Sequence, residues 1–287
     1  MTELPTDGGR PTIWQTESTS RPRVLYPILQ SESDTILHVA AGIAEAIDAE
    51  LVVGRVDVDD DYSYETSREV AHTVFQAQAD PLVEVGVEGH ALSGSNRLEA
   101  IVDAATTDQI NIVVMGDETS ERLERQIAER TGCDTVVVND RAPLGSIASI
   151  LVPIASGPHS GAAVNVAGAL AEANDAWIEL VHVLEDDDSE ADRELADTIL
   201  EGGRSLLPDG LEVDTRVIEA DDTVDAIAEE SAYHDLTVIG APRKDRLRRL
   251  IFGSTATEIR DEVRNTVVMA RKGSDPDVSL FAALLSG

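Results

Sequence analysis

The sequence contains very few cysteines and no long apolar runs. Cys133 is its only cysteine, so an intramolecular disulfide and a zinc site built from several thiolates are both excluded. This thiol follows Gly132 just before an apolar run, so we expect it to be packed rather than reactive. No run reaches the ~18 apolar residues that a membrane-spanning helix needs, and residues 1–20 lack the apolar core of a signal peptide. We therefore predict a soluble, cytoplasmic protein that is not inserted in a membrane.

Aromatic residues (3%) and positive charge are also scarce. The chain has 55 Asp and Glu residues against 22 Lys and Arg, a formal net charge of -33, and its only lysines are Lys244 and Lys272. Nucleic acids bind basic surfaces, so we expect no nucleic-acid partner. Molar salt shortens the Debye length to about 3 Å and screens the self-repulsion of such a surface. The composition therefore favours a halophilic protein over the alternative, an ordinary acidic protein.

The chain contains two copies of one pattern. Four segments recur in order, at offsets of 126, 127, 124 and 131 residues: 23–29 with 149–155, 49–56 with 176–183, 111–116 with 235–240, and 134–138 with 265–269. The jump in the last offset means that the second copy is seven residues longer before its final apolar run. The copies therefore share a scaffold and differ at one edge of it.

In both copies, short apolar runs alternate with longer segments of helical periodicity. The expected strands are 23–29, 51–57, 82–88, 111–116, 134–138, 148–154, 177–183, 212–218, 236–240 and 266–270. The expected helices are 33–48, 65–78, 97–108, 119–130, 161–173, 189–203, 222–233 and 255–263. Apolar strands separated by helices indicate a parallel sheet covered on both faces. We therefore predict an α/β fold with two tandem, doubly wound, five-stranded parallel-sheet domains.

The predicted organisation has four parts. A disordered N-terminal segment (1–20) precedes a first domain (21–141), a second domain (146–273) and a C-terminal tail (274–287). The tail contains the apolar run Leu280–Leu285, which we expect to pack back onto its own domain rather than to grip a partner.

The segment after Gly240 has the composition of an anion site. Five cations fall within seven positions: Arg243, Lys244, Arg246, Arg248 and Arg249. They lie between an apolar strand and a Gly-Ser-Thr that can begin a helix, so free backbone N–H groups, a helix dipole and cationic side chains can meet at one place. A phosphate group suits such a place. The alternatives are a solvated helix face and a docking surface for an acidic partner.

The same residues resemble a known family. Gly240, Gly253 and Ser254 resemble the universal stress protein signature G-x2-G-x9-G-[S/T], and so do three phrases of the second copy: Ile150–Ile154, Val181–Val183 and Thr266–Met269. Two copies would cover nearly everything between Arg23 and Lys272. The resemblance implies an adenine-nucleotide-alpha-hydrolase-like fold, ATP or AMP as ligand (or loss of that ability), and self-association through the last strands, either within one chain or in a homodimer.

The resemblance also implies a site, from which this sequence departs at three points. Adenine would lie against Ala155 and Val183, and the phosphates over five residues: Gly240, Arg243, Gly253, Ser254 and Thr255. The signature's second glycine is Arg243 here, and the family's Asp at the end of the first strand is Ala155. The first copy lacks the loop and continues from Gly116 into Asp117. We therefore expect a nucleotide site in the second domain alone, where Arg243 either blocks the phosphate or clamps it.

Other polar features fit structural roles. The acidic runs 57–61 and 185–188 are expected to be solvated surface rather than a cation site, and Ser156–Ser160 a strand-to-helix turn. The six histidines lack the spacing of metal ligands, and His182 is expected to be a hydrogen-bonded core residue. No metal site is predicted.

Three functions from different classes remain. The first is a non-catalytic stress or regulatory protein whose second domain senses an adenine nucleotide. The second is a nucleotide-free interaction module that dimerises and regulates a membrane transporter or another partner. The departures at Ala155 and Arg243 suggest the loss of the nucleotide, and a resemblance to the paired domains appended to some amino-acid transporters in salt-adapted microbes implies the partner. The third is an ATP hydrolase, for which the loop offers Asp245 but no defined pair of Mg²⁺ ligands. We predict the first, and no enzyme activity.

Overall fold

The computed structural model describes residues 21–57, 64–139, 144–185, 189–241 and 265–283. The predicted N-terminal segment 1–20, the helix 255–263 and the basic loop lie outside these residues. The first half of the molecule comprises the elements up to residue 139, and the second half comprises those from residue 144 onward.

The first half alternates strands with helices. Its strands are β1 (Arg23–Ile28), β2 (Glu50–Asp57), β3 (Val87–Ser93), β4 (Ile112–Gly116) and β5 (Asp134–Asn139). Its helices are α1 (Asp34–Ala46), α2 (Tyr64–Ala79), α3 (Arg97–Thr107) and α4 (Glu121–Thr131).

The second half repeats this alternation. Its strands are β6 (Ser149–Pro153), β7 (Trp177–Leu184), β8 (Val213–Glu219), β9 (Leu236–Gly240) and β10 (Thr266–Arg271). Its helices are α5 (Ser160–Asn174), α6 (Glu190–Ser205) and α7 (Thr223–Ser231), and the short helix α9 (Leu280–Ala283) lies in the C-terminal segment.

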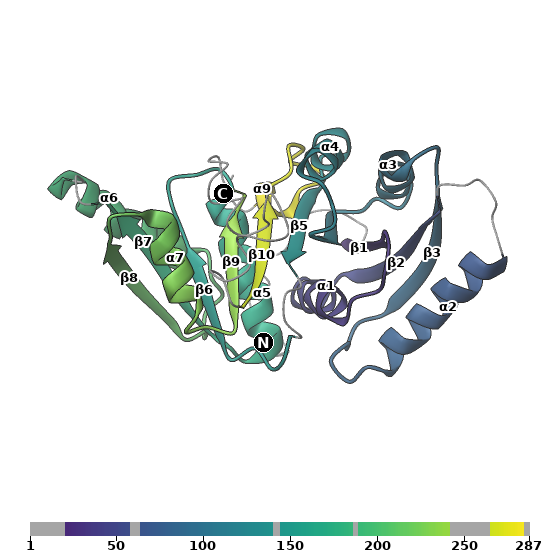
Figure 1. Ribbon diagram of the computed structural model, residues 1–287, viewed down its shortest axis with the longest axis horizontal. Helices are drawn as coiled ribbons and strands as arrows, with labels where there is room; N and C mark the ends of the chain where they lie inside the picture. The colour runs from purple at the N-terminus through teal and green to yellow at the C-terminus, as the bar shows by residue number, and fades with distance from the viewer. Residues whose placement is uncertain (1–20, 58–63, 140–143, 186–188, 242–264, 284–287) are drawn as a thin grey trace, which may run out of the picture.

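The strands form one sheet of ten in the order β3-β2-β1-β4-β5-β10-β9-β6-β7-β8 (Figure 1). Neighbouring strands are parallel within each half, and the two halves meet where β5 and β10 pair antiparallel. Both halves have the same internal strand order. The predicted α/β fold, with its parallel strands and alternating helices, is confirmed.

Side-chain caps set where several helices begin. Ser33, Asn96, Ser120 and Asp222 precede α1, α3, α4 and α7, and each side-chain oxygen accepts a hydrogen bond from a backbone N–H of the first turn. At the other end of α4, Gly132 adopts the left-handed conformation (φ 73°) that ends the helix. These polar residues therefore fix the ends of helices whose bodies are fixed by apolar packing.

The core lies on both faces of the junction between β5 and β10. Val136 and Val138 of β5 belong to the apolar cluster on one face, and Val137 belongs to the cluster on the other. On the first of these faces α1 and α5 pack against each other, as Figure 1 shows, with Gly42 of α1 close to Leu170 of α5. The junction is therefore buried as thoroughly as the centre of either half.

One strand lies elsewhere than predicted. The run 82–88 was expected to form the third strand, but β3 begins at Val87, and Leu82 is 61% exposed. β3 is an edge strand and pairs with β2 alone. Its position along the chain therefore depends on that pairing and on its packing against α2. Gly89 lies so close to Val70 of α2 that a Cβ atom there would be 2.6 Å from the valine side chain. Only a residue without a side chain allows this approach, and this sets the register.

The C-terminal segment connects the two halves. Leu280 and Phe281 are buried, and α9 contacts α5 of the second half. Its hydrogen bonds, however, reach Asp134 and Asn111 of the first half. The expectation that the tail packs onto its own domain is therefore only half correct. Of the helices in the described ranges, none combines the length and the apolar character needed to cross a bilayer.

Candidate functional site

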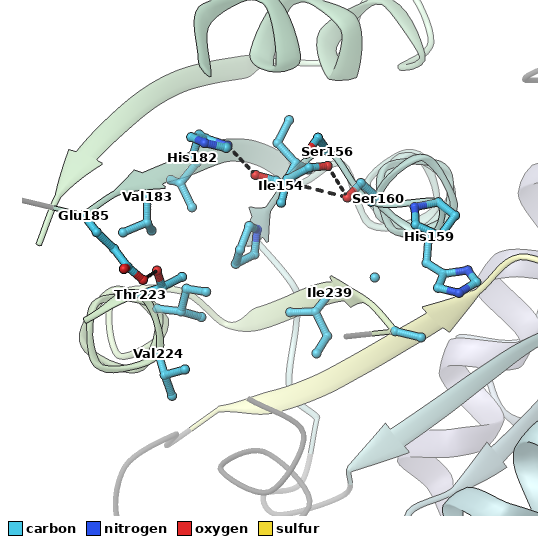
Figure 2. Close-up of a pocket in the computed structure, with 18 of the residues that line it drawn as sticks. Ile154, Ser156, His159, Ser160, His182, Val183, Glu185, Thr223, Val224 and Ile239 are labelled. Carbon is cyan, nitrogen blue, oxygen red and sulfur yellow. Dashed lines mark hydrogen bonds between the residues drawn. The ribbon is translucent and has the colours of Figure 1, made fainter. Parts of the chain in front are cut away.

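A cavity of about 480 Å³ opens in the second half at the carboxyl ends of its strands. The chain leaves β6 toward β7 and β8 on one side, and β9 and β10 lie on the other. Loops that leave the two sides of such a switch point diverge and leave a crevice, which is where open α/β sheets bind ligands. The lining comes from the loop between β6 and α5, the end of β7, the start of α7 and the end of β9 (Figure 2).

Apolar side chains from different elements line much of the cavity. Ile154 follows β6, Val183 lies in β7, Val224 in α7 and Ile239 in β9. Ala155 adds a methyl group and no side-chain hydrogen-bonding group. Apolar walls with a few polar groups are typical of small-molecule sites and suit a flat, uncharged ring.

The loop between β6 and α5 is closed by its own hydrogen bonds. The Ser160 hydroxyl donates to the Ala155 carbonyl oxygen at 2.6 Å, and its oxygen accepts from the Ala155 N–H at 3.3 Å (Figure 2). The Gly157 N–H donates to the same carbonyl at 2.7 Å. The predicted strand-to-helix turn at 156–160 is therefore confirmed, and it forms a fixed wall of the cavity.

At the cavity, α5 begins without a side-chain cap. His159 occupies the N-cap position, but its side chain makes no capping bond, and the first turn holds no acidic residue. Its Nδ1 instead accepts a hydrogen bond from the backbone N–H of Lys272, at 3.2 Å. The positive end of the helix dipole therefore lies beside the cavity with no carboxylate in the helix's first turn to neutralise it.

Gly240 allows β9 to approach this loop. A Cβ atom at residue 240 would lie 2.7 Å from the carbonyl carbon and oxygen of His159 and 3.0 Å from the Ser160 nitrogen. These are backbone atoms and cannot rotate away. The glycine therefore has a steric role at the cavity rim, in addition to its place in the signature.

His182 differs in part from its expected role. Its Nδ1–H donates to the Ile154 carbonyl oxygen at 2.8 Å, so the imidazole is hydrogen-bonded as expected. It is only partly buried, however, and lines the cavity, as Figure 2 shows. The bond fixes both the ring and the tautomer, because a carbonyl oxygen accepts only from a protonated nitrogen.

Three polar residues at the far side of the cavity were not predicted as site residues. The Thr223 hydroxyl donates to Glu185 at 2.9 Å, and Asp222 accepts from the N–H groups of Val224 and Asp225 (Figure 2). In the sequence, Glu185 begins an acidic run interpreted as solvated surface, and Asp222 is the first residue of an expected helix. Their positions in the sequence could have indicated a role in the site, because Glu185 follows β7 and Asp222 follows β8, and parallel strands end at the same edge of the sheet.

The described residues bring three of the predicted site residues together. Ala155, Val183 and Gly240 line the same cavity. The other four, which were predicted to hold the phosphates, lie outside the described residues: Arg243, Gly253, Ser254 and Thr255.

The corresponding place in the first half differs. The carboxylate of Glu118 lies over Gly116, so that a Cβ atom there would be 2.0 Å from its Oε2. Gly116 aligns with Gly240, which instead lies against backbone atoms of His159 and Ser160. An acidic group in this position repels an anion.

Comparison with known proteins places this cavity within a family's matched region. Residues 147–271 match the model of the universal stress protein family. The match covers the whole of the second half's sheet, including the cavity. No protein of curated function matches the chain.

Solved structures resemble the whole chain at low sequence identity. A universal stress protein from Archaeoglobus fulgidus DSM 4304 is 16% identical, with a TM-score of 0.55, over 88% of this chain and 97% of that one. A functionally unknown protein from Pseudomonas aeruginosa PAO1 is 14% identical, with a TM-score of 0.53, over 93% and 98%. The cytoplasmic domain of a prokaryotic cation chloride cotransporter is 12% identical, with a TM-score of 0.58, over 93% and 100%. These similarities establish a shared fold across both halves.

Proposed function

We propose that the second half binds an adenine nucleotide, ATP or AMP, in the cavity between β6, β7 and β9, and that the protein is a non-catalytic regulator. The observation that carries this proposal is the convergence of an apolar slot, an uncapped helix start and the Gly240 rim at the strand switch point. The five cations that follow Gly240 in the sequence add the charge that phosphates require.

The polar groups of the cavity give the ligand one orientation. Adenine packs against Ala155 and Val183, where the wall is apolar. The ribose hydroxyls donate to Glu185, which already accepts from Thr223. Glu185 and Asp222 repel phosphates, which therefore lie at the opposite end, near Gly240 and the start of α5.

Calorimetric titration of the whole chain with ATP, AMP and cyclic nucleotides in molar KCl tests the proposal. We expect heat with at least one of them, and a loss of affinity of at least about tenfold in Val183→Trp, because the indole fills the slot. Val217→Trp, in the neighbouring strand β8 and outside the cavity lining, is the matched control. No heat with any nucleotide would contradict the proposal.

One observation favours a second function, a nucleotide-free interaction module. Ala155 presents no hydrogen-bonding side chain where the family resemblance places an Asp. The shared fold with a transporter's cytoplasmic domain supplies the kind of partner to look for, a membrane transporter. Pull-down from membranes in high salt separates the two functions: recovery of a transporter, together with a thermally silent nucleotide titration, would replace the first proposal by the second.

A further inference from the structure

The strands that join the two halves do not by themselves distinguish one half from the other. β5 and β10 carry the similar runs Thr135–Val138 and Thr266–Met269, and their antiparallel pairing sets Val138 opposite Val268. Two first halves, or two second halves, could form the same backbone ladder with equally apolar side chains. Contacts that select the unlike pair are therefore to be sought outside this backbone ladder.

The first such contact is made by Asp134, at the start of β5. Its side chain is fully buried and accepts hydrogen bonds from the Gly273 N–H (2.7 Å), the Ser279 hydroxyl (2.6 Å) and the Phe281 N–H (3.0 Å). All three donors belong to the C-terminal segment that follows β10. Nearby, Asn111 donates to the Val278 carbonyl oxygen at 2.9 Å. The first half thus supplies a buried acceptor, and these three donors come from the second half.

The second contact is an ion pair on the opposite face of β5, between Glu124 and Arg271. Glu124 of α4 is fully buried, and its Oε1 accepts from Arg271 Nε of β10 at 2.5 Å and from the Thr135 hydroxyl at 2.9 Å. The strand register places Arg271 directly opposite Thr135. Again the carboxylate comes from the first half and its partner from the second.

We propose that Asp134 and Glu124 form a recognition site on the first half for β10 and the C-terminal segment of the second half, and that this site makes the two halves pair with each other rather than each with its own kind in another copy. The partner that the site fits is residues 271–281 of this chain.

Pairing of two first halves loses both contacts. At the offset of 131, Arg271 aligns with Asp140, so the first half's sequence offers Glu124 an acidic residue instead of an arginine. Asp134 would remain buried without the C-terminal donors. Two second halves would offer those donors to Asn265, the residue that aligns with Asp134. An unpaired buried carboxylate strongly destabilises the structure that holds it, so the first-with-first pair is disfavoured.

A double-mutant cycle on the chain tests this role. Asp134→Asn is made in the full chain and in a chain ending at Lys272, and urea unfolding is followed in molar KCl. In the shortened chain Asp134 has lost its donors, so removing its charge favours folding by about tenfold or more relative to the same change in the full chain. Glu129→Gln, at an exposed carboxylate of α4, is the control and changes both chains alike.

Two further measurements address the tail and the choice of partner. In the full-length Asp134→Asn chain, the amide group sets an N–H against the Phe281 N–H, so cleavage of residues 273–281 by a protease becomes faster than in the native chain. Light scattering then reports a larger dimer fraction for the shortened Asp134→Asn chain, which lacks both the carboxylate and its donors, than for the native chain.

Equal effects of Asp134→Asn in both chains, or equal dimer fractions, would overturn the proposal. If the shortened chain does not fold, Ser279→Ala in the full chain replaces the truncation, because it removes a single donor. The expected coupling with Asp134→Asn is then smaller but of the same sign, and its absence is equally decisive.

Discussion

At Gly240 the end of β9 passes so close to the loop before α5 that a methyl group does not fit. In Gly240→Ala the new Cβ meets backbone atoms of His159 and Ser160, so the loop must move. We expect a loss of about 1–3 kcal/mol in the free energy of unfolding. We also expect weaker nucleotide binding, because the same loop forms a wall of the cavity.

The matched control for this change is Gly202→Ala in α6. Gly202 is exposed, and an added Cβ meets nothing within 4 Å. In a helix this change is expected to stabilise by roughly 0.5–1 kcal/mol. Chemical denaturation measures both variants. Equal effects of the two substitutions would show that the approach at Gly240 is not as tight as the structure indicates.

Asp134 makes the stability of the protein depend on pH. Burial raises the pKa of its carboxyl group to about 6 from an ordinary value of 3.8, although the hydrogen bonds from Gly273, Ser279 and Phe281 oppose this. The folded state therefore holds this proton more tightly than the unfolded state. The stabilisation is present in full below pH 4 and is lost as the pH rises through 6, by up to about 3 kcal/mol.

The difference between the native chain and Asp134→Asn isolates this effect, because the chain's other carboxylates titrate in both. Burial raises the pKa of the thiol of Cys133, the residue before Asp134, to about 11, so this thiol stays neutral throughout. Relative to Asp134→Asn, the native chain should lose stability between pH 4 and 7. A pH-independent difference would show that the pKa of Asp134 is ordinary.

Among the elements, those fixed by their own sequence are the ones that could be predicted. β9 has the predicted bounds, and each end of α5 and β7 lies within one residue of the predicted one, because the apolar pattern of a segment is a local property. β3 could not be placed, because its register depends on how closely α2 approaches Gly89. The C-terminal segment was assigned to one half for the same reason: Leu280 and Phe281 are visibly apolar, but the buried Asp134 that orders their backbone is 147 residues from Phe281.

The residues of the candidate site likewise fall into those that local sequence motifs predicted and those that only the fold brings to the cavity. Ala155, Val183 and Gly240 follow from motif positions and converge in one cavity. Glu185, Asp222 and Thr223 were missed, because a carboxylate before a helix has the same sequence pattern whether it caps the helix or also faces a ligand. Only the topology, which brings the ends of β7 and β8 to one edge, separates these roles.

For the whole molecule, the net charge of -33 dominates the response to salt. The Debye length falls from about 10 Å at 0.1 M to about 3 Å at 1 M, which removes most of the repulsion between surface carboxylates in the compact state. We therefore expect the free energy of unfolding, followed by circular dichroism in urea, to rise from 0.1 to 2 M KCl. Full stability in dilute buffer would contradict the halophilic interpretation.

A charge variant separates screening from other effects of salt. Asp197, Glu201 and Asp209 are exposed, and replacing all three by lysine changes the formal net charge from -33 to -27. If self-repulsion limits stability, this variant is more stable than the native chain at 0.1 M KCl and gains less from added salt. If salt acts by strengthening apolar burial instead, both chains gain equally, because the three substitutions leave the buried junction between β5 and β10 unchanged. The salt dependence of the variant therefore decides which force holds the acidic chain compact.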